Sequence, residues 1–218
     1  MTIGLSQPDG RLALAEANHR FLNTLSALGG LLRRDFDAFA DPTVRDAARR
    51  FSSRLHAFAD VHRTLGEPGG ETTVDAPAHL ARLCAELCEA HLAPRGLYCE
   101  FTSDPGSLPR DTCQTLSLIV VELVTNAVKH AFAGRGWGRV RIALRRTEAS
   151  WICVVADNGS GFGGGPAGDG LKLVRRLAAQ LNADFRIHSD AGGVIVFLRL
   201  PDDPTVLQAD AARRPCEA

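Results

Sequence analysis

The sequence predicts an α+β protein in two parts, an N-terminal pair of helices followed by a domain of mixed helices and strands. Over the first third of the chain, apolar residues recur at three- and four-residue steps, which is typical of amphipathic helices. The stretch 66–70, Gly-Glu-Pro-Gly-Gly, then interrupts the pattern and marks a domain boundary. Beyond it, short alternating stretches mix with helical ones, which indicates an α/β sandwich with helices on one face of a sheet.

Two amphipathic helices are expected before the boundary, over 11–35 and from Asp41-Pro42 to about 65, because an Asp-Pro pair is typical of a helix start. Two helices in a hairpin cannot bury their apolar stripes alone, so we expect a homodimer in which two hairpins form a four-helix bundle. The stripes consist of Leu14, Phe21, Leu25, Leu28 and Leu32 in the first helix, and Val44, Ala48, Phe51, Leu55, Phe58 and Val61 in the second.

The second part is expected to alternate between strands and helices, with mainly antiparallel strands. The expected strands are 72–75, 97–101, 138–146, 151–155, 185–187 and 194–200, and the expected helices are 78–92, 109–132 and 169–181. The predicted organisation is a loose leader (1–10), the helical hairpin (11–68), the α/β domain (69–201) and a flexible tail (202–218).

Composition narrows the class of protein. Lys and Arg number 25, as do Asp and Glu, so the formal net charge is zero and nothing favours nucleic acid or an anionic membrane as partner. No apolar run is long enough to cross a bilayer and the first residues lack a signal-peptide pattern, so a cytoplasmic protein is expected. The cysteines do not form a zinc pattern and are expected to be ordinary thiols: Cys84, Cys88, Cys99, Cys113, Cys153 and Cys216.

A polar face on the predicted helix 109–132 indicates a metal and phosphate site. Glu122 and Asn126 are one turn apart and share a face, and Lys129 and His130 follow a turn later. Mg²⁺ prefers oxygen ligands and keeps much of its water, so an Asn amide oxygen beside a carboxylate suits a magnesium ion that bridges phosphates. Lys129 or His130 would add positive charge near those phosphates.

Two glycine-rich stretches downstream complete a predicted nucleotide site. Asp157 ends a buried strand, where its carboxylate can accept a hydrogen bond from the exocyclic amine of adenine, and Gly159 and Gly161 after it allow close approach of a ligand. The second stretch, Gly168-Asp169-Gly170-Leu171, opens a helix whose N-terminus can hold phosphate. Asp169 either places a negative charge where phosphates would pass or caps that helix. No Gly-Lys-Ser or Gly-Lys-Thr follows, so the site is not a Walker A loop.

His19 in the first helix is a candidate phosphoryl acceptor, because an exposed imidazole is partly neutral near pH 7 and its lone pair can attack phosphorus. Arg20 could steady phosphate charge, and Asn23, one turn on, could hydrogen-bond the imidazole or a water molecule.

These strings resemble known motifs. The Glu-Asn helix and the two glycine stretches resemble the N, G1 and G2 boxes of histidine kinases and the GHKL ATPase superfamily, and 16–25 and 54–62 resemble the phosphoacceptor box and second-helix signature of HWE and closely related histidine kinases. The resemblance implies a Bergerat-type ATP-binding domain, with Asn126 at the magnesium ion and Glu122 orienting metal-bound water or assisting proton transfer. It also implies that His19 takes the γ-phosphoryl group of ATP and passes it to an Asp of a response-regulator receiver.

Two features leave alternatives open. Only 18 residues precede His19, so we expect the input to come from a partner such as a separate sensor protein, from the regulator's own state, or from no signal at all. The segment between Phe162 and Gly168 is shorter than the ATP lid of most histidine kinases. One alternative is therefore a ChpT-type histidine phosphotransferase, which relays phosphate between receivers without ATP, and a lesser one is an anti-sigma-type regulator. The complete set of nucleotide residues favours the kinase.

Overall fold

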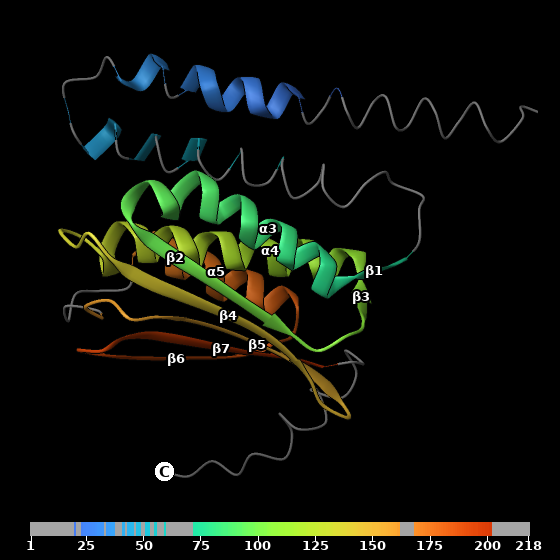
Figure 1. The fold of residues 1–218 in the computed structure, drawn as a ribbon. Coiled ribbons are helices and arrows are strands. Elements are labelled where there is room, and N and C mark those ends of the chain that lie inside the picture. The colour runs from blue at the N-terminus through green and yellow to red at the C-terminus, as the bar shows by residue number, and fades with distance from the viewer. Residues whose placement is uncertain are drawn as a thin grey trace, which may run out of the picture. The chain divides into compact units, whose positions relative to one another are not determined.

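The computed structural model describes residues 20, 23–32, 34–37, 41, 43–45, 47–48, 51–52, 55, 59, 72–161 and 168–201 (Figure 1). The chain divides into two compact units, Met1–Val74 and Asp75–Ala218. The predictions for the leader, for His19, for the segment 162–167 and for the tail lie outside the described residues. None of the described helices is long and apolar enough to span a lipid bilayer.

The described residues of the first unit are helical on both sides of Asp41, as predicted. Residues 23–32 and 34–37 belong to the first helical stretch, and 43–45, 47–48, 51–52, 55 and 59 to the second. The Asp41 carboxylate accepts a hydrogen bond from the Thr43 amide at 2.8 Å, and its carbonyl accepts one from the Arg45 amide at 3.2 Å. These bonds satisfy amides that the first helical turn leaves without partners, so the prediction that Asp41 starts the second helix is confirmed.

A buried hydrogen bond joins the two helical stretches, and apolar side chains remain exposed beside it. The Ser52 hydroxyl, which is buried, donates to the Gly29 carbonyl at 2.6 Å. In contrast, Leu28, Leu31 and Phe51 expose 47%, 44% and 53% of their surface. Apolar side chains this exposed on a helix mark a face that one chain does not cover.

The described part of the chain from Thr73 onward contains the predicted helices and strands in the predicted order. They are β1 (Thr73–Asp75), α3 (Ala76–Leu87), β2 (Leu97–Ser103), α4 (Arg110–Asn126), β4 (Gly138–Arg146), β5 (Ser150–Asp157), α5 (Asp169–Gln180), β6 (Asp184–Asp190) and β7 (Gly193–Pro201). The sequence analysis missed β3 (Ser107–Pro109), the π-helical turns η1 (Cys88–Leu92) and η3 (Ala127–Ala131), and the 3-10 turn η2 (Ala93–Arg95).

Five strands form the main sheet, in the order β2-β4-β5-β7-β6 (Figure 1). The β2–β4 pair is parallel and the other three pairs are antiparallel. The sheet is therefore mainly antiparallel, as predicted. Two further strands, β1 and β3, pair in a separate two-stranded sheet. Because β5 lies between β4 and β7, the end of β5 at Asp157 is placed beside the start of β7.

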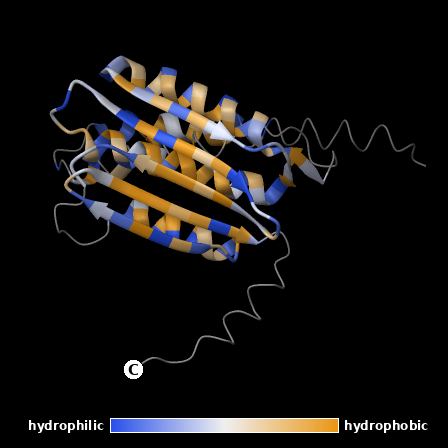
Figure 2. Cartoon of the chain, turned by 60° about the horizontal axis from the view of Figure 1, so that its bottom comes forward, coloured by the Kyte–Doolittle hydropathy of each residue, from blue (hydrophilic) through white to orange (hydrophobic). Residues whose placement is uncertain are grey.

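The helices cover one face of the main sheet, and the core lies between them and the sheet (Figure 1). Along β4, Val140, Ile142 and Leu144 are buried while Arg139, Arg141 and Arg145 are exposed, so the predicted alternation is confirmed. Figure 2 shows this alternation of apolar and polar residues along the strands. Burial of the inward residues against α3, α4 and α5 gives the α/β sandwich that the sequence predicts.

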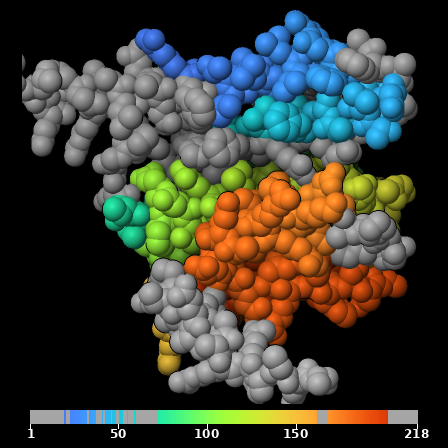
Figure 3. All heavy atoms as spheres, turned by 180° about the vertical axis from the view of Figure 1, so that it is seen from behind, coloured from blue at the N-terminus to red at the C-terminus, as the bar shows by residue number. Residues whose placement is uncertain are grey.

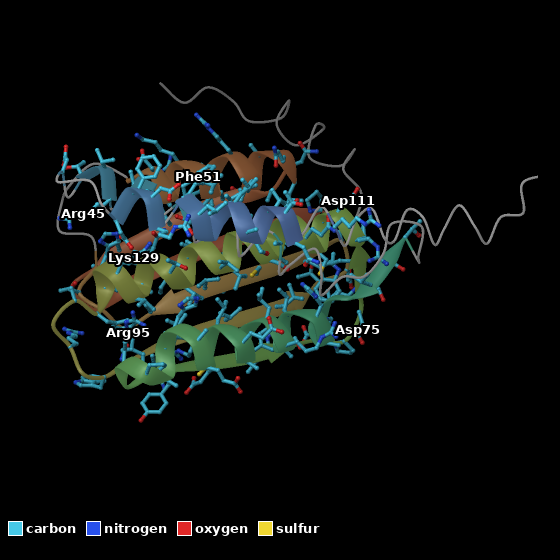
Figure 4. The ribbon with its side chains drawn as sticks, turned by 90° about the horizontal axis from the view of Figure 1, so that it is seen from above. Arg45, Phe51, Asp75, Arg95, Asp111 and Lys129 are labelled. Carbon is cyan, nitrogen blue, oxygen red and sulfur yellow. The ribbon has the colours of Figure 1, made fainter. Side chains whose placement is uncertain are left out.

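Helices α3 and α4 pack side by side and run in the same direction. Asp75 and Asp111 at their N-terminal ends lie at one end of the unit, and Arg95 and Lys129 lie at the other (Figure 4). A buried contact joins the two helices, because the His79 imidazole Nε2 lies 2.8 Å from the Ser117 hydroxyl. Burial, with a smaller contribution from the charge of Arg82, lowers the pKa of His79 to about 4.

Candidate nucleotide-binding site

The C-terminal end of α4 carries the predicted metal and phosphate residues. Glu122 is buried and Asn126 half-buried, four residues apart on the same face of the helix. Directly after Asn126 the helix widens into the π-helical turn η3, which presents Lys129 and His130 to solvent. Single π turns within helices occur frequently at functional sites, where they redirect side chains.

The start of α5 lies against these residues. A methyl group on Gly170 would lie 2.8 Å from the amide nitrogen and 2.9 Å from the amide oxygen of Asn126, and closer still to a carboxylate oxygen of Glu122. Only a residue without a Cβ atom fits this contact unless the neighbours move. The structure thus brings the predicted second glycine stretch onto the predicted metal face of α4.

The N-terminus of α5 has its own capping arrangement, which corrects one expectation. The residue at the cap is Gly168, whose carbonyl accepts from the Leu171 and Lys172 amides at 3.1 and 3.3 Å. Asp169 lies in the first turn and pairs with Lys172 at 3.3 Å, so the prediction that Asp169 caps the helix is wrong. The amides of Asp169 and Gly170 belong to the first turn of α5, where backbone amides can hold an anion.

Leu171 is buried, which anchors the first turn of α5 in the core. In the space-filling view α5, drawn in orange, and the β6–β7 hairpin form one continuous surface of this unit (Figure 3).

Asp157 stands at the end of β5, where one of its carboxylate oxygens accepts two backbone hydrogen bonds. Its Oδ1 atom accepts hydrogen bonds from the Gly159 amide at 2.9 Å and from the Val194 amide at 3.3 Å. Its Oδ2 atom has no hydrogen-bond partner among the described residues. Burial raises the pKa of Asp157, while the two amides act in the opposite direction. A half-buried carboxylate with one unengaged oxygen can accept a hydrogen bond from a ligand.

The loop after Asp157 packs closely against η3 and the β6–β7 turn. Gly159 contacts Ala131 so closely that a Cβ atom there would overlap it, and the Ser160 amide donates to the Ala131 carbonyl at 3.1 Å. Gly161 has a φ of +69°, a conformation that favours glycine, and it lies against the Asp190 carbonyl. These contacts hold the start of the loop against η3, at the end of α4, and hold Gly161 against the β6–β7 turn.

Asn158 fixes the same loop to β4. Its side-chain Oδ1 atom accepts from the Arg139 amide at 2.7 Å, and its own amide donates to the Arg139 carbonyl at 3.2 Å. Sequence reasoning missed Asn158, Ala131, Asp190 and Val194 as residues that shape the site. The neighbouring Gly192 and Gly193 were the available signal, since paired glycines mark a tight turn.

The structure therefore brings predicted nucleotide residues together in two clusters. Glu122, Asn126 and Gly170 touch one another, and Asp157, Gly159 and Gly161 form the second cluster. His19 lies outside the described residues, whereas Arg20 and Asn23 are described and exposed on the first helical stretch. The Arg20 carbonyl accepts from the Thr24 hydroxyl at 2.8 Å, an ordinary contact within a helix.

The donor set at Glu122 and Asn126 fits a magnesium ion that is bound mainly through a nucleotide. A carboxylate and an amide oxygen are hard ligands of the kind Mg²⁺ prefers. Within the described ranges no three His, Cys, Asp or Glu residues gather closely enough to hold a metal. A magnesium ion here would accordingly complete its coordination with phosphate oxygens and water, which is its usual behaviour in phosphoryl-transfer sites.

Two family models match successive parts of the chain. The HisKA_2 family, described as histidine kinase, matches residues 16–91, and the family described as histidine kinase-, DNA gyrase B- and HSP90-like ATPase matches residues 113–204. Sensor histidine kinase PdtaS of Mycolicibacterium smegmatis is 29% identical over 197 residues, which are 86% of this chain and 39% of the relative. Blue-light-activated histidine kinase 2 of Erythrobacter litoralis is 25% identical over 197 residues, 86% of this chain and 56% of the relative.

The fold is shared with a solved histidine kinase domain. That domain, from the Erythrobacter litoralis EL346 blue-light activated histidine kinase, superposes with a TM-score of 0.61 at 20% identity, covering 82% of this chain and 95% of that one. The chain spans about two fifths to just over half of the length of the curated relatives it matches. The chain thus carries an HWE-type HisKA_2 region followed by a histidine kinase-like ATPase domain, and the curated relatives that it matches are histidine kinases.

Proposed function

We propose that this protein phosphorylates its own His19 from magnesium-ATP and passes the phosphoryl group to an Asp of a response-regulator receiver domain. One observation carries the proposal. Gly170 at the start of α5 lies against Glu122 and Asn126 of α4, and among the described residues Asp157 uses only one of its two carboxylate oxygens. The first group of residues would serve the phosphates of a nucleotide and Asp157 its base. The matched HisKA_2 region includes His19, the proposed acceptor.

At the base end, Asp157 would accept a hydrogen bond from the exocyclic amine of adenine through Oδ2. Its other oxygen is already held by the amides of Gly159 and Val194, so the carboxylate cannot turn freely. A held acceptor favours adenine, whose amine donates, over guanine, whose oxygen at the same position accepts and would be repelled.

At the phosphate end, Asn126 and Glu122 would hold the magnesium ion, and the first amides of α5 would face phosphate oxygens. When bound, Mg²⁺ neutralises the charge that develops on the transferring phosphoryl group. Lys129 and His130, on the exposed turn that follows Asn126, supply further positive charge at this end of α4 when the imidazole is protonated. Glu122, buried beside Asn126, would orient water on the metal or assist the proton transfer.

In the transfer step, an imidazole nitrogen of His19 forms a bond to the γ-phosphorus while the bond from that phosphorus to the bridging oxygen breaks, and ADP leaves. Catalysis is mostly positioning and charge neutralisation, because the protein has little covalent work to do. Arg20 and Asn23 flank His19 in the first helix, where they would steady the phosphate and the imidazole. The phosphohistidine then gives its phosphoryl group to a receiver carboxylate.

We further propose that the protein acts as a homodimer. The exposed apolar side chains Leu28, Leu31 and Phe51 support this, because a second hairpin would cover them in a four-helix bundle. A separate sensor protein and a cytoplasmic location stay predictions of the sequence.

The test is autophosphorylation of the full chain with γ-labelled ATP and Mg²⁺, compared with His19→Ala and Asn126→Ala. The proposal predicts acid-labile label on the parent and none on either folded variant, because one lacks the acceptor and the other the metal contact. No label on a folded parent, together with transfer to His19 from a phosphorylated receiver, would instead support the phosphotransferase alternative. The short segment between Phe162 and Gly168 is the feature that keeps this alternative in view.

A further inference from the structure

The turn between β6 and β7 touches the base end of the proposed nucleotide site at three points, although none of its residues belongs to a predicted motif. The Val194 amide donates to Asp157 Oδ1 at 3.3 Å. Gly193 lies against the Asp157 carbonyl, so closely that a Cβ atom there would overlap it. The Asp190 carbonyl lies against Gly161 in the same way, at the far end of the loop that follows Asp157.

The turn is itself held in shape. The Asp190 carboxylate accepts from the Gly192 amide at 2.7 Å, and its other oxygen lies 3.4 Å from the His188 imidazole. Gly193 has a φ of +133°, which only glycine adopts without strain. Hairpin pairing of β6 with β7 begins directly at Asp190 and Gly193, so the turn is anchored at the start of two strands of the main sheet.

We propose that the β6–β7 turn, Asp190 to Gly193 with the amide of Val194, is a positioning element that aims Asp157 at the nucleotide base and sets selectivity for adenine over guanine. This inference rests on the proposed role of Asp157 in base recognition. The Val194 amide and the Gly159 amide share Oδ1, which leaves Oδ2 as the oxygen offered to a base. Gly193 allows the backbone of β7 to come close enough for the Val194 amide to reach that carboxylate.

Losing this support should affect the two bases differently. Adenine donates from its amine to a carboxylate oxygen, so a displaced or rotated Asp157 weakens ATP binding. Guanine presents an acceptor at that position and gains nothing from the native carboxylate, so GTP binding should change little. General damage to the domain would weaken both nucleotides alike. The ratio of the two dissociation constants therefore separates a positioning role from a structural one.

The experiment is a calorimetric titration of the full chain with Mg-ATP and with Mg-GTP, in two turn variants and one control. Gly193→Ala places a methyl group against the Asp157 carbonyl, and Val194→Pro removes the donated amide. Gly136→Ala is the control outside the turn, because its methyl group would meet no described atom within 4 Å. Asp157→Asn serves as the reference for lost base recognition, and thermal melting confirms that each variant is folded.

We expect Gly193→Ala and Val194→Pro to lower the preference for ATP at least about tenfold, as the loss of a hydrogen bond to a charged group does, and Gly136→Ala to keep it. If Gly193→Ala does not fold, Val194→Pro decides. A folded turn variant that keeps the parental ratio, or that weakens both nucleotides equally, would overturn the inference while Asp157→Asn still loses the preference. If Asp157→Asn itself keeps the parental ratio, the proposed base recognition fails, and the inference fails with it.

Discussion

Replacing Gly170 with Ala should abolish tight nucleotide binding while leaving the protein folded. The added methyl group would lie 2.8 Å from the Asn126 amide nitrogen and still closer to a Glu122 oxygen, so both side chains must move. Gly168→Ala is the matched control two residues earlier, where a Cβ atom would meet nothing within 4 Å and the backbone has a φ of −65°. The two variants add the same group to the same end of α5.

The expected change in stability is small because two effects oppose each other. Overpacking of a close contact costs about 1–3 kcal/mol. Alanine in place of glycine in a helix returns up to about 1 kcal/mol. The free energy of unfolding should thus fall by about 0–2 kcal/mol for Gly170→Ala, a loss that a marginally stable domain usually survives. Gly168→Ala should leave the free energy of unfolding within about 0.5 kcal/mol of the parent.

The expected change in binding is much larger. A hydrogen bond to a charged group is worth about 1.5–3 kcal/mol, so displacing Glu122 and Asn126 from Mg-ATP should raise its dissociation constant about tenfold to a hundredfold. Titration with a fluorescent ATP analogue in the presence of Mg²⁺ measures this constant, and urea denaturation measures the stability. Equal affinities of Gly170→Ala and Gly168→Ala would refute the reasoning, since only Gly170 contacts the proposed metal residues.

Three further predictions follow from other parts of the structure. The pKa of His79 is about 4 in the folded protein and 6.5 in the unfolded chain, so folding favours the neutral imidazole. The free energy of unfolding should therefore be highest above pH 6.5. It should fall by about 3 kcal/mol as the pH drops to 4. Urea denaturation at several pH values should show this loss in the parent and a weaker dependence in His79→Gln. Ser52→Ala leaves the buried Gly29 carbonyl without its donor and should destabilise the first unit by about 1–3 kcal/mol, seen as a lower thermal midpoint; an unchanged midpoint would mean that water replaces the donor. Phe51→Glu places a charge on the exposed apolar face and should shift the protein toward monomer in sedimentation velocity, whereas Glu148→Gln, on an exposed turn of the second unit, should not.

The sequence predicted most strands and helices of the second unit because their patterns are strong. Strict alternation over Gly138–Arg146 predicted β4 with the bounds that the structure has. The π turn over Ala127–Ala131 was not predictable, because one widened turn adds a single residue to the helix and leaves no periodic trace. The strand Ser107–Pro109 was missed because it is only three residues long and depends on pairing with β1.

In the candidate site too, residue patterns predict some features, while others depend on the fold. Glu122, Asn126, Asp157 and Gly170 were predicted because their residue types and spacing carry the chemistry. The contacts that support them come from the order of strands in the sheet, which a single sequence does not reveal. Val194, which holds Asp157, follows it by 37 residues and reaches it only because β5 and β7 are neighbours.

The most direct test of the central claim is to identify the residue that carries phosphate after the full chain is incubated with Mg-ATP. Peptide mapping by mass spectrometry at neutral pH, where phosphohistidine survives, gives the position. The account predicts phosphate on His19 that is lost in acid, and no such phosphate in a folded Asn126→Ala variant. Phosphate on a different residue, or none on a protein that binds Mg-ATP, would contradict it.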